Sequence, residues 1–228
     1  ESGSNSAASL GCTNLYADNY ETEAIIDDGS CIFSQDLNLS EGWNMFSLNV
    51  IPNLTSLYDI ISPIHDNMIL VLDESGSAIF QNESGTDWFD NIGSWYATEG
   101  YLIKMQSNQN LNITSDQPVL LPFIIDLTEG WNLISYPIQT DEGDYVENVL
   151  SSLIAEQSIY MMFDESGNVF IPDYITGDDA QNSIVTMSPG NAYYIKVLED
   201  TQLSIYEPSV IVDNHPIVQE SRTNHFVP

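Results

Sequence analysis

The sequence predicts a mainly β protein: two tandem homologous antiparallel β domains, each with one short helix, preceded by a small disulfide-closed loop module. Three observations support this prediction. Sequence motifs recur at offsets of 88, 91 and 92 residues. Short segments in which apolar and polar residues alternate are separated by turn residues. The only two cysteines lie at the two ends of a short N-terminal segment. An offset near 90 residues exceeds a solenoid unit and fits two small tandem domains.

The repeated text occurs at three places in each copy. EGWNMFS at 41–47 matches EGWNLIS at 129–135, DESG at 73–76 matches 164–167, and GYLIK at 100–104 matches AYYIK at 192–196. We therefore divide the chain into five parts: a flexible arm (1–10), a disulfide-closed acidic mini-module (11–35), β-rich repeat 1 (36–121), β-rich repeat 2 (122–207) and an extended tail or linker (208–228).

The first two parts are short and polar. Residues 1–10 carry small polar side chains and offer nothing to bury, as in a flexible linker. Cys12 and Cys31 then bracket a compact segment, and a bridge closing a loop of roughly 20 residues contributes about 3 kcal/mol by the chain-entropy estimate. We predict a Cys12–Cys31 disulfide. The alternative is a pair of buried free thiols, which a cytosolic protein would favour.

Each repeat is predicted to hold the same elements in the same order. A polar lead-in strand and a Glu-Gly turn precede a strand that starts at Trp43 or Trp131 and runs to a proline. A helical period follows, then a hairpin across the DESG turn, then two closing strands. The apolar positions of the helical period are Leu54, Leu57, Tyr58, Ile61 and Ile64 in repeat 1, and Tyr145, Val146, Val149, Leu150 and Leu153 in repeat 2.

Composition restricts the partners. The formal net charge is -31, from 34 acids against three bases, while 43% of residues are hydrophobic and 11% aromatic. This combination indicates a folded acidic protein. Because self-repulsion destabilises it at low ionic strength, we expect its native setting to supply salt or divalent cations. Three basic residues cannot form the basic patch that binding to nucleic acid or to an anionic membrane needs. The longest nearly unbroken apolar stretch, 118–125, is far short of the roughly 20 residues that span a bilayer, so no membrane insertion is expected.

Two patterns resemble known protein modules. GCTN at 11–14, NY at 19–20 and DDGSC at 27–31 resemble short disulfide-closed modules of secreted and surface proteins of marine bacteria and of virion proteins of marine phages. Asn14 stands where those modules usually carry aspartate. The GWN…GYxIK repeats resemble β-rich modules that accompany them. The resemblance, which covers roughly residues 11–206, implies extracellular modular architecture of the adhesin, surface-layer or appendage kind, and no reaction.

We therefore expect a non-enzymatic exported structural or display protein: a subunit or module of a cell-surface layer, an appendage filament or a virion exterior, which self-assembles or contacts neighbouring surface proteins. The alternative is a carbohydrate- or surface-binding module of a larger secreted protein. The start at Glu1, without a leader, fits a removed signal peptide or a segment of a longer chain. His65, His215 and His225 lie apart, and no catalytic motif includes them.

Calcium is the one candidate cofactor, because hard cations take carboxylate and carbonyl oxygens from glycine-containing loops. The candidate ligands within the disulfide-closed loop are Asp18, Asn19, Asp27 and Asp28. The alternative is a tight turn at 27–29 whose side chains cap backbone amides. The acids of the two hairpin turns are predicted to be solvated, with weak cation binding as the alternative; they are Asp73, Glu74, Asp164 and Glu165.

The rare lysines and the tryptophans complete the candidates. Lys104 and Lys196, at matching positions, are predicted to form structural ion pairs with carboxylates of their own repeats. Trp43 and Trp131 are predicted core anchors. The aromatics Trp88, Trp95 and Tyr96 have no counterpart in repeat 2; they either pack a local loop or form an exposed sugar-binding platform.

Overall fold

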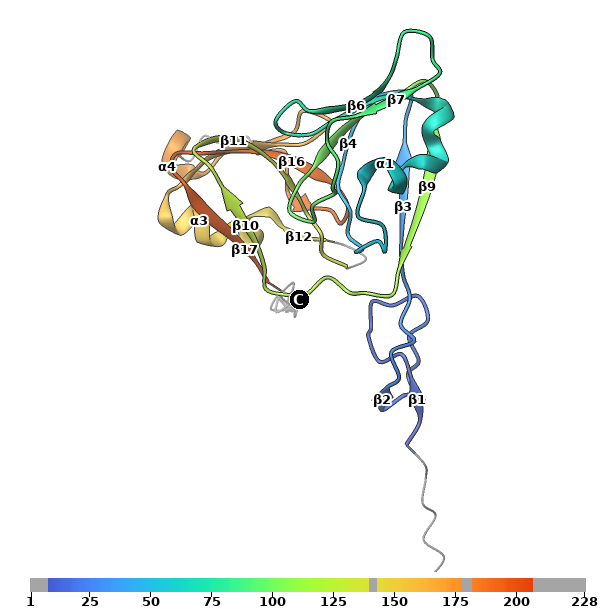
Figure 1. Cartoon of the computed structure of the whole chain (residues 1–228). Coiled ribbons are helices and arrows are strands. Elements are labelled where there is room, and N and C mark those ends of the chain that lie inside the picture. The colour runs from blue at the N-terminus through green and yellow to red at the C-terminus, as the bar shows by residue number, and fades with distance from the viewer. Residues whose placement is uncertain (1–7, 140–142, 178–181, 207–228) are drawn as a thin grey trace, which may run out of the picture.

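The structure is a computed structural model that describes residues 8–139, 143–177 and 182–206. The described chain is mainly antiparallel β-sheet with a few short helices, as predicted. Two lobes stand side by side, and the N-terminal segment with strands β1 (Leu10–Gly11) and β2 (Ile26–Asp27) projects from the end of the first lobe (Figure 1). No helix within these ranges has the length and apolar character to cross a membrane.

The first half, residues 33–115, contains two sheets. Strand β3 (Phe33–Leu39) pairs with β9 (Gln109–Ser115) in one of them. The other is antiparallel with the order β4-β8-β5-β6-β7. Its strands, in chain order, are β4 (Gly42–Phe46), β5 (Met68–Leu72), β6 (Ala78–Gln81), β7 (Trp88–Asp90) and β8 (Tyr101–Met105).

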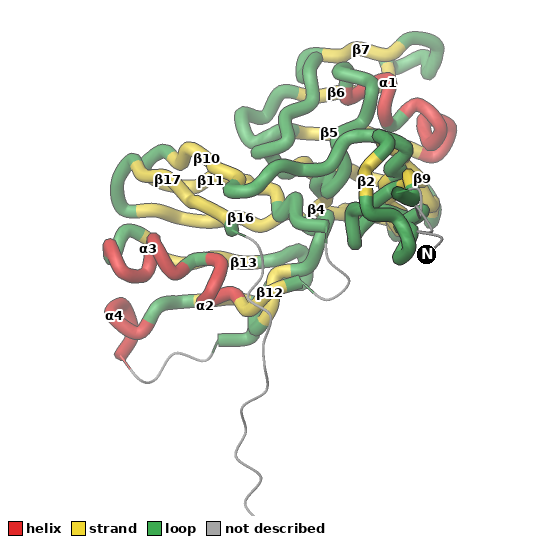
Figure 2. The backbone as a smooth tube through the Cα atoms, turned by 90° about the horizontal axis from the view of Figure 1, so that it is seen from below, coloured by secondary structure: helices red, strands yellow, loops and turns green. Residues whose placement is uncertain are grey.

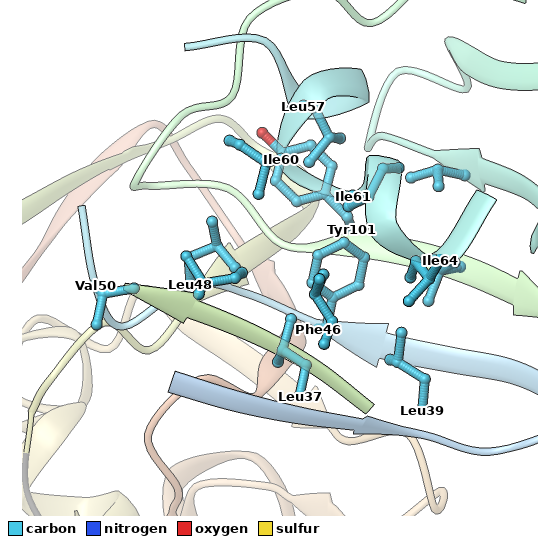
Figure 3. Close-up of a cluster of buried hydrophobic side chains, with 14 of the residues drawn as sticks. Leu37, Leu39, Phe46, Leu48, Val50, Leu57, Ile60, Ile61, Ile64 and Tyr101 are labelled. Carbon is cyan, nitrogen blue, oxygen red and sulfur yellow. The ribbon is translucent and has the colours of Figure 1, made fainter. Parts of the chain in front are cut away.

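The core of the first half lies between these sheets and two short helices. Ser56 caps helix α1 (Leu57–Ile60) by accepting a hydrogen bond from the Asp59 amide, and the 3-10 helix η1 (Ser62–Asn67) follows. Apolar residues of α1 and η1 face the rings of Phe46 and Tyr101, with the leucines of β3 beyond them (Figure 3). Buried and exposed residues alternate along β3, which is the expected period of a strand with one solvated face.

The second half, residues 123–205, repeats this strand order. It has a two-stranded sheet β10-β17 and a four-stranded sheet β11-β16-β13-β14 around a second buried cluster. The same irregularity also recurs, since register shifts occur between Met68 and Leu70 and between Ile159 and Met161. The strands are β10 (Phe123–Leu127), β11 (Gly130–Ser135), β13 (Ile159–Phe163), β14 (Val169–Phe170), β16 (Ala192–Val197) and β17 (Thr201–Ile205).

The halves differ in their additions. The second half adds a small sheet of β12 (Asp144–Tyr145) and β15 (Thr186–Met187), and its described residues, which leave out 140–142 and 178–181, include no counterpart of β7. Its helices are α2 (Val146–Val149), α3 (Ser151–Glu156) and α4 (Asp173–Thr176). Helices α3 and α4 lie on the side of the second lobe away from the first (Figure 2). The predicted helical period thus yields α1 and η1 in one half and α2 and α3 in the other, while α4 was not predicted.

The N-terminal segment shares its core with the first half. Cys12 and Cys31 form the predicted disulfide. Both cysteines and Ala17 belong to the buried cluster of the first half, and Phe33 at the start of β3 continues it. The predicted boundary after residue 35 therefore falls inside β3. The division into separate domains stays a prediction, and most of the predicted arm and all of the predicted tail lie outside the described residues.

Candidate functional site

The side chains of the predicted calcium loop make capping hydrogen bonds. The Gly29 amide donates to Asp27 Oδ1 at 2.8 Å, and the Ser30 amide donates to Asp28 Oδ1 at 3.0 Å. The hydroxyl and amide of Ser30 lower the pKa of Asp28 by stabilising its carboxylate. Asn19 donates to the Ser30 carbonyl and accepts from the Ile32 amide. This geometry matches the tight-turn alternative.

Asp18, the remaining predicted calcium ligand, has an exposed side chain. Within residues 8–139, 143–177 and 182–206, no group of three or more His, Cys, Asp or Glu side chains is placed to hold a metal ion. Calcium binding by this loop stays a prediction.

The hairpin turns do more than expose acids to solvent. The first acid of each turn closes the turn itself: the Ser77 amide donates to Asp73 Oδ1 at 2.8 Å, and the Asn168 amide donates to Asp164 Oδ1 at 2.9 Å. The second acid reaches the other half. The Leu133 amide donates to Glu74 Oε2 at 3.1 Å, and the Met45 amide donates to Glu165 Oε2 at 3.0 Å. We call these the reciprocal caps.

The reciprocal caps protect strand edges. Strands β4 and β11 are edge strands of their sheets, so their outward amides have no strand partner. The turns that precede β8 and β16 each add a bond to the opposite half. The Ser47 amide donates to the Gly190 carbonyl at 2.8 Å, and the Ser135 amide donates to the Thr98 carbonyl at 3.2 Å. The two halves therefore exchange equivalent bonds about an approximate two-fold axis.

The axis passes near Gly100 and Ala192, which match each other at an offset of 92 residues. A Cβ atom placed on Gly100 would lie 2.5 Å from Ala192 Cβ and 2.9 Å from the Ile134 carbonyl oxygen. Real Cβ atoms do not approach that closely. Glycine at position 100 therefore permits the close packing of the two halves.

Three carboxylates gather beside this junction. Asp73, Glu74 and Glu99 line one surface hollow together with Ser75. Burial raises the pKa of Glu74 and of Glu99, and the charge of Asp73 raises both further. Hydrogen bonds from the Leu133 amide and the Tyr101 hydroxyl partly oppose these shifts. The junction therefore concentrates negative charge at a partly desolvated position.

The prediction that Trp43 and Trp131 anchor the core is wrong. Their side chains are 48% and 43% exposed. The buried residue of the Gly-Trp-Asn motif is the asparagine. The Ser40 amide donates to Asn44 Oδ1 at 2.7 Å, and the Thr128 amide donates to Asn132 Oδ1 at 2.9 Å, so each asparagine fixes the turn before its strand. Strand alternation then directs the adjacent tryptophan outward.

The lysines lie over these tryptophans. Lys104 Nζ is 5.5 Å from the centre of the Trp43 ring, and Lys196 Nζ is 5.8 Å from the Trp131 ring and 5.1 Å from the Tyr160 ring. All three distances are typical of cation–π contacts. Across the described ranges, neither ammonium has a carboxylate oxygen within 4.0 Å. The partner of each lysine is an aromatic ring of its own half instead of the predicted counter-ion.

The predicted aromatic platform is not a single surface. Trp88 packs on the core side, with its ring 4.8 Å from His65 and 6.2 Å from Tyr58. Trp95 also packs against the first buried cluster. Only Tyr96 is well exposed, at 55%. Trp88 and Trp95 therefore pack a local loop, as the alternative prediction has it. His65, beside the rings of Tyr58 and Trp88, has its pKa lowered by burial.

A different set of side chains is exposed on the outer face of the five-stranded sheet. The strand register places Trp43 opposite Lys104, Lys104 opposite Leu70, Leu70 opposite Phe80, and Phe80 opposite Phe89. These five residues, which we call the outer row, cross all five strands. Phe80 and Phe89 stack with ring centres 5.4 Å apart. Half-exposed apolar residues in adjacent positions of one face are characteristic of an interaction surface.

The β3-β9 sheet shows how this chain builds an ordinary solvated face. Its exposed positions are polar: Ser34, Asp36, Asn38, Asn110, Asn112 and Thr114. The outer row therefore differs from the rest of the sheet surface of the same half. Sequence alternation alone does not reveal it, because β4, β5 and β8 carry apolar residues on both faces. In comparisons with family models, curated proteins and solved structures, no match to this chain was found.

Proposed function

We propose that this chain is a non-enzymatic structural or display subunit of an extracellular assembly, such as a cell-surface layer, an appendage or a virion exterior. The observation that carries the proposal is the outer row, an apolar face on a chain whose net charge is -31. A soluble monomer gains nothing from such a face, whereas an assembling subunit buries it against a neighbour.

Two further features support the proposal. The reciprocal caps and the contact at Gly100 join the halves, so the two lobes form a stiff building block. The Cys12–Cys31 disulfide suits an oxidising setting outside the cytosol.

Self-association is the direct test. We expect the full chain to form oligomers or filaments that grow with protein concentration and with added salt, because salt screens the repulsion between copies. Sedimentation velocity and negative-stain microscopy across a NaCl series measure this. EDTA at constant ionic strength separates general screening from bridging by divalent cations. A protein that stays monomeric at all concentrations and salt levels contradicts the proposal.

The exposure of Trp43 and Trp131 favours one alternative, a carbohydrate-binding module, because sugars stack on exposed indole rings. A glycan array probed with the wild-type chain and with Trp43→Ala and Trp131→Ala variants tests it. Binding by a monomer that either substitution abolishes favours this alternative over the structural role. Trp88→Ala is a poor probe, because Trp88 packs against the core.

A further inference from the structure

We propose that the outer row docks face to face against the same row of a second copy of this chain. This inference deepens the proposed assembly function and rests on it. The row joins residues from all five strands of the sheet: Trp43, Lys104, Leu70, Phe80 and Phe89. Its exposed members include Trp43 at 48%, Phe80 at 37% and Phe89 at 50%.

Charge selects this face for contact between copies. Acids make up 34 of 228 residues, so most surfaces of two copies repel each other. The outward positions of the five strands hold no acid; besides the outer row they are Met45, Ile69, Leu72, Ala78 and Leu102. The only charge among them is the ammonium of Lys104. Two copies that meet here bring together outward strand positions without acids, and the Glu165 carboxylate on the Met45 amide lies at the edge of this face, beside β4.

The order of the residues within the row favours one arrangement of the two copies. A two-fold axis parallel to the strands through Leu70 reverses the row in the second copy. Trp43 then faces Phe89, Lys104 faces Phe80, and Leu70 faces Leu70. Each lysine gains a second aromatic partner in this arrangement. An axis along the row would instead bring the two Lys104 ammonium groups together, which like-charge repulsion opposes. The interface is therefore isologous.

Across residues 123–139, 143–177 and 182–205, the second half does not offer an equivalent row. Lys196 already contacts two rings of its own half, Trp131 and Tyr160. Among the described residues, the four-stranded sheet has no strand beyond β14 and no residue that corresponds to Phe89. Strand β7 thus extends the apolar face of the first half. One docking face per chain gives a closed dimer through this contact, and larger assemblies need a different second contact.

The size of the face predicts a weak contact. A fully buried aromatic side chain contributes about 150–250 Å². Three half-exposed rings with Leu70, Ile69 and Lys104 give a few hundred Å² per copy, below the roughly 800 Å² of a standard interface. We therefore expect association that depends on concentration and strengthens with salt, as screening removes the repulsion between the acidic bodies.

Matched substitutions test the face. Phe89→Asp and Ile124→Asp add the same charge at strand residues that are both 50% exposed, and Ile124 lies on β10 of the other half. In sedimentation velocity at ~0.5 M NaCl, where screening is strong, Phe89→Asp is expected to weaken dimerisation at least about tenfold. Ile124→Asp is expected to leave the wild-type dimerisation constant within about twofold, given that surface changes typically cost little.

A second pair keeps the test decisive if Phe89→Asp fails to fold. Lys104→Glu is expected to abolish the dimer, whereas Lys196→Glu, with the same change in charge, leaves it intact; circular dichroism verifies the fold of each. Equal dimerisation by Phe89→Asp, Ile124→Asp and wild type overturns the docking face while the assembly proposal stands. A wild-type chain that never associates overturns both.

Discussion

Asn44 and Asn132 illustrate how single residues define each half. Each is buried next to an exposed tryptophan, and each bonds to both backbone groups of the residue four positions earlier. A buried polar group is retained where its hydrogen bonds are satisfied, and these bonds are local. The repeated Gly-Trp-Asn motif thus marks a turn that places the tryptophan beside the lysine of the neighbouring strand. The motif is structural, and its aromatic residue remains available to a partner.

The contact between Trp43 and Lys104 is expected to stabilise the fold modestly. A double-mutant cycle with Trp43→Leu and Lys104→Met should give a coupling free energy of about 0.5–1 kcal/mol, as exposed cation–π pairs do. Urea unfolding of the four proteins measures it. The pair Trp43 and Lys196, which belong to different halves, serves as the control and should show no coupling. A coupling near zero for Trp43 and Lys104 would contradict the assigned contact.

Glu99 is expected to make stability depend on pH. Its pKa in the folded state is raised above the ordinary 4.5, chiefly by burial, so the folded state binds the proton more tightly than the unfolded state. Its ionisation therefore destabilises the fold at neutral pH, and this penalty disappears as the pH falls through the raised pKa toward 4.5.

Glu99→Gln should accordingly raise the urea midpoint at neutral pH and lose this advantage in acid. The glutamine keeps an oxygen that accepts from the Tyr101 hydroxyl. Glu83→Gln removes the same charge from an exposed loop residue and corrects for the general benefit of lowering the net charge. The assignment fails if the two substitutions give identical pH profiles.

At the scale of elements, the sequence predicted the order of strands and helices well. The repeated sequence motifs predict the same order of strands in both halves, and both halves have this strand order. The sequence did not reveal which strand face is buried. In β4 the residues Trp43, Met45 and Phe46 are all apolar, and the buried set consists of Asn44 and Phe46. Which face of β4 is buried depends on the turn that the Asn44 side chain fixes. The alternation of residue types along the strand does not predict it.

The candidate-site residues were predicted with less success for the same reason. Lys104 and Lys196 stand out because lysine is rare, yet a carboxylate is the default partner in a chain with 34 acids. Their aromatic partners come from a strand distant in sequence. Glu74 and Glu165 likewise resemble any solvated turn acid, and only the packing of the halves assigns them to the amides of Leu133 and Met45.

The disulfide is expected to hold the N-terminal segment against the first half. The two cysteines are 19 residues apart, and removing a bridge over such a loop costs about 3 kcal/mol in the chain-entropy model. The double variant Cys12→Ser/Cys31→Ser should therefore unfold at lower urea concentration than the wild type under oxidising conditions. A reducing agent should lower the wild-type midpoint and leave the variant unchanged. An equal midpoint for both proteins would count against this role.

At the scale of the whole molecule, the two halves behave as one body because they share a junction rather than a linker alone. The reciprocal caps close an edge of each sheet, and Gly100 meets Ala192 beside the axis. We therefore expect one cooperative unfolding transition for the full chain, in which loss of the junction destabilises both lobes together.

Gly100→Ala should weaken that junction. Its new methyl group would overlap Ala192 and the Ile134 carbonyl, and such overpacking typically costs about 1–3 kcal/mol. Calorimetry should show the melting temperature fall by about 2–4 °C per kcal/mol for a chain of this length. The transposed pair Gly100→Ala/Ala192→Gly should recover part of the loss, because it relieves the contact between the two Cβ positions. A double variant no better than the single one contradicts this account.

The reciprocal caps also constrain how the chain can evolve. Glu74 and Glu165 each belong to one half but satisfy an amide of the other, so a mutation in either turn is felt by the neighbouring lobe. We therefore expect substitutions in the two turns to be coupled in their effect on stability. In the described part of the chain, the sheet edges away from the junction satisfy no amide of the other half, and strand β7 lies at one such edge, opposite β4.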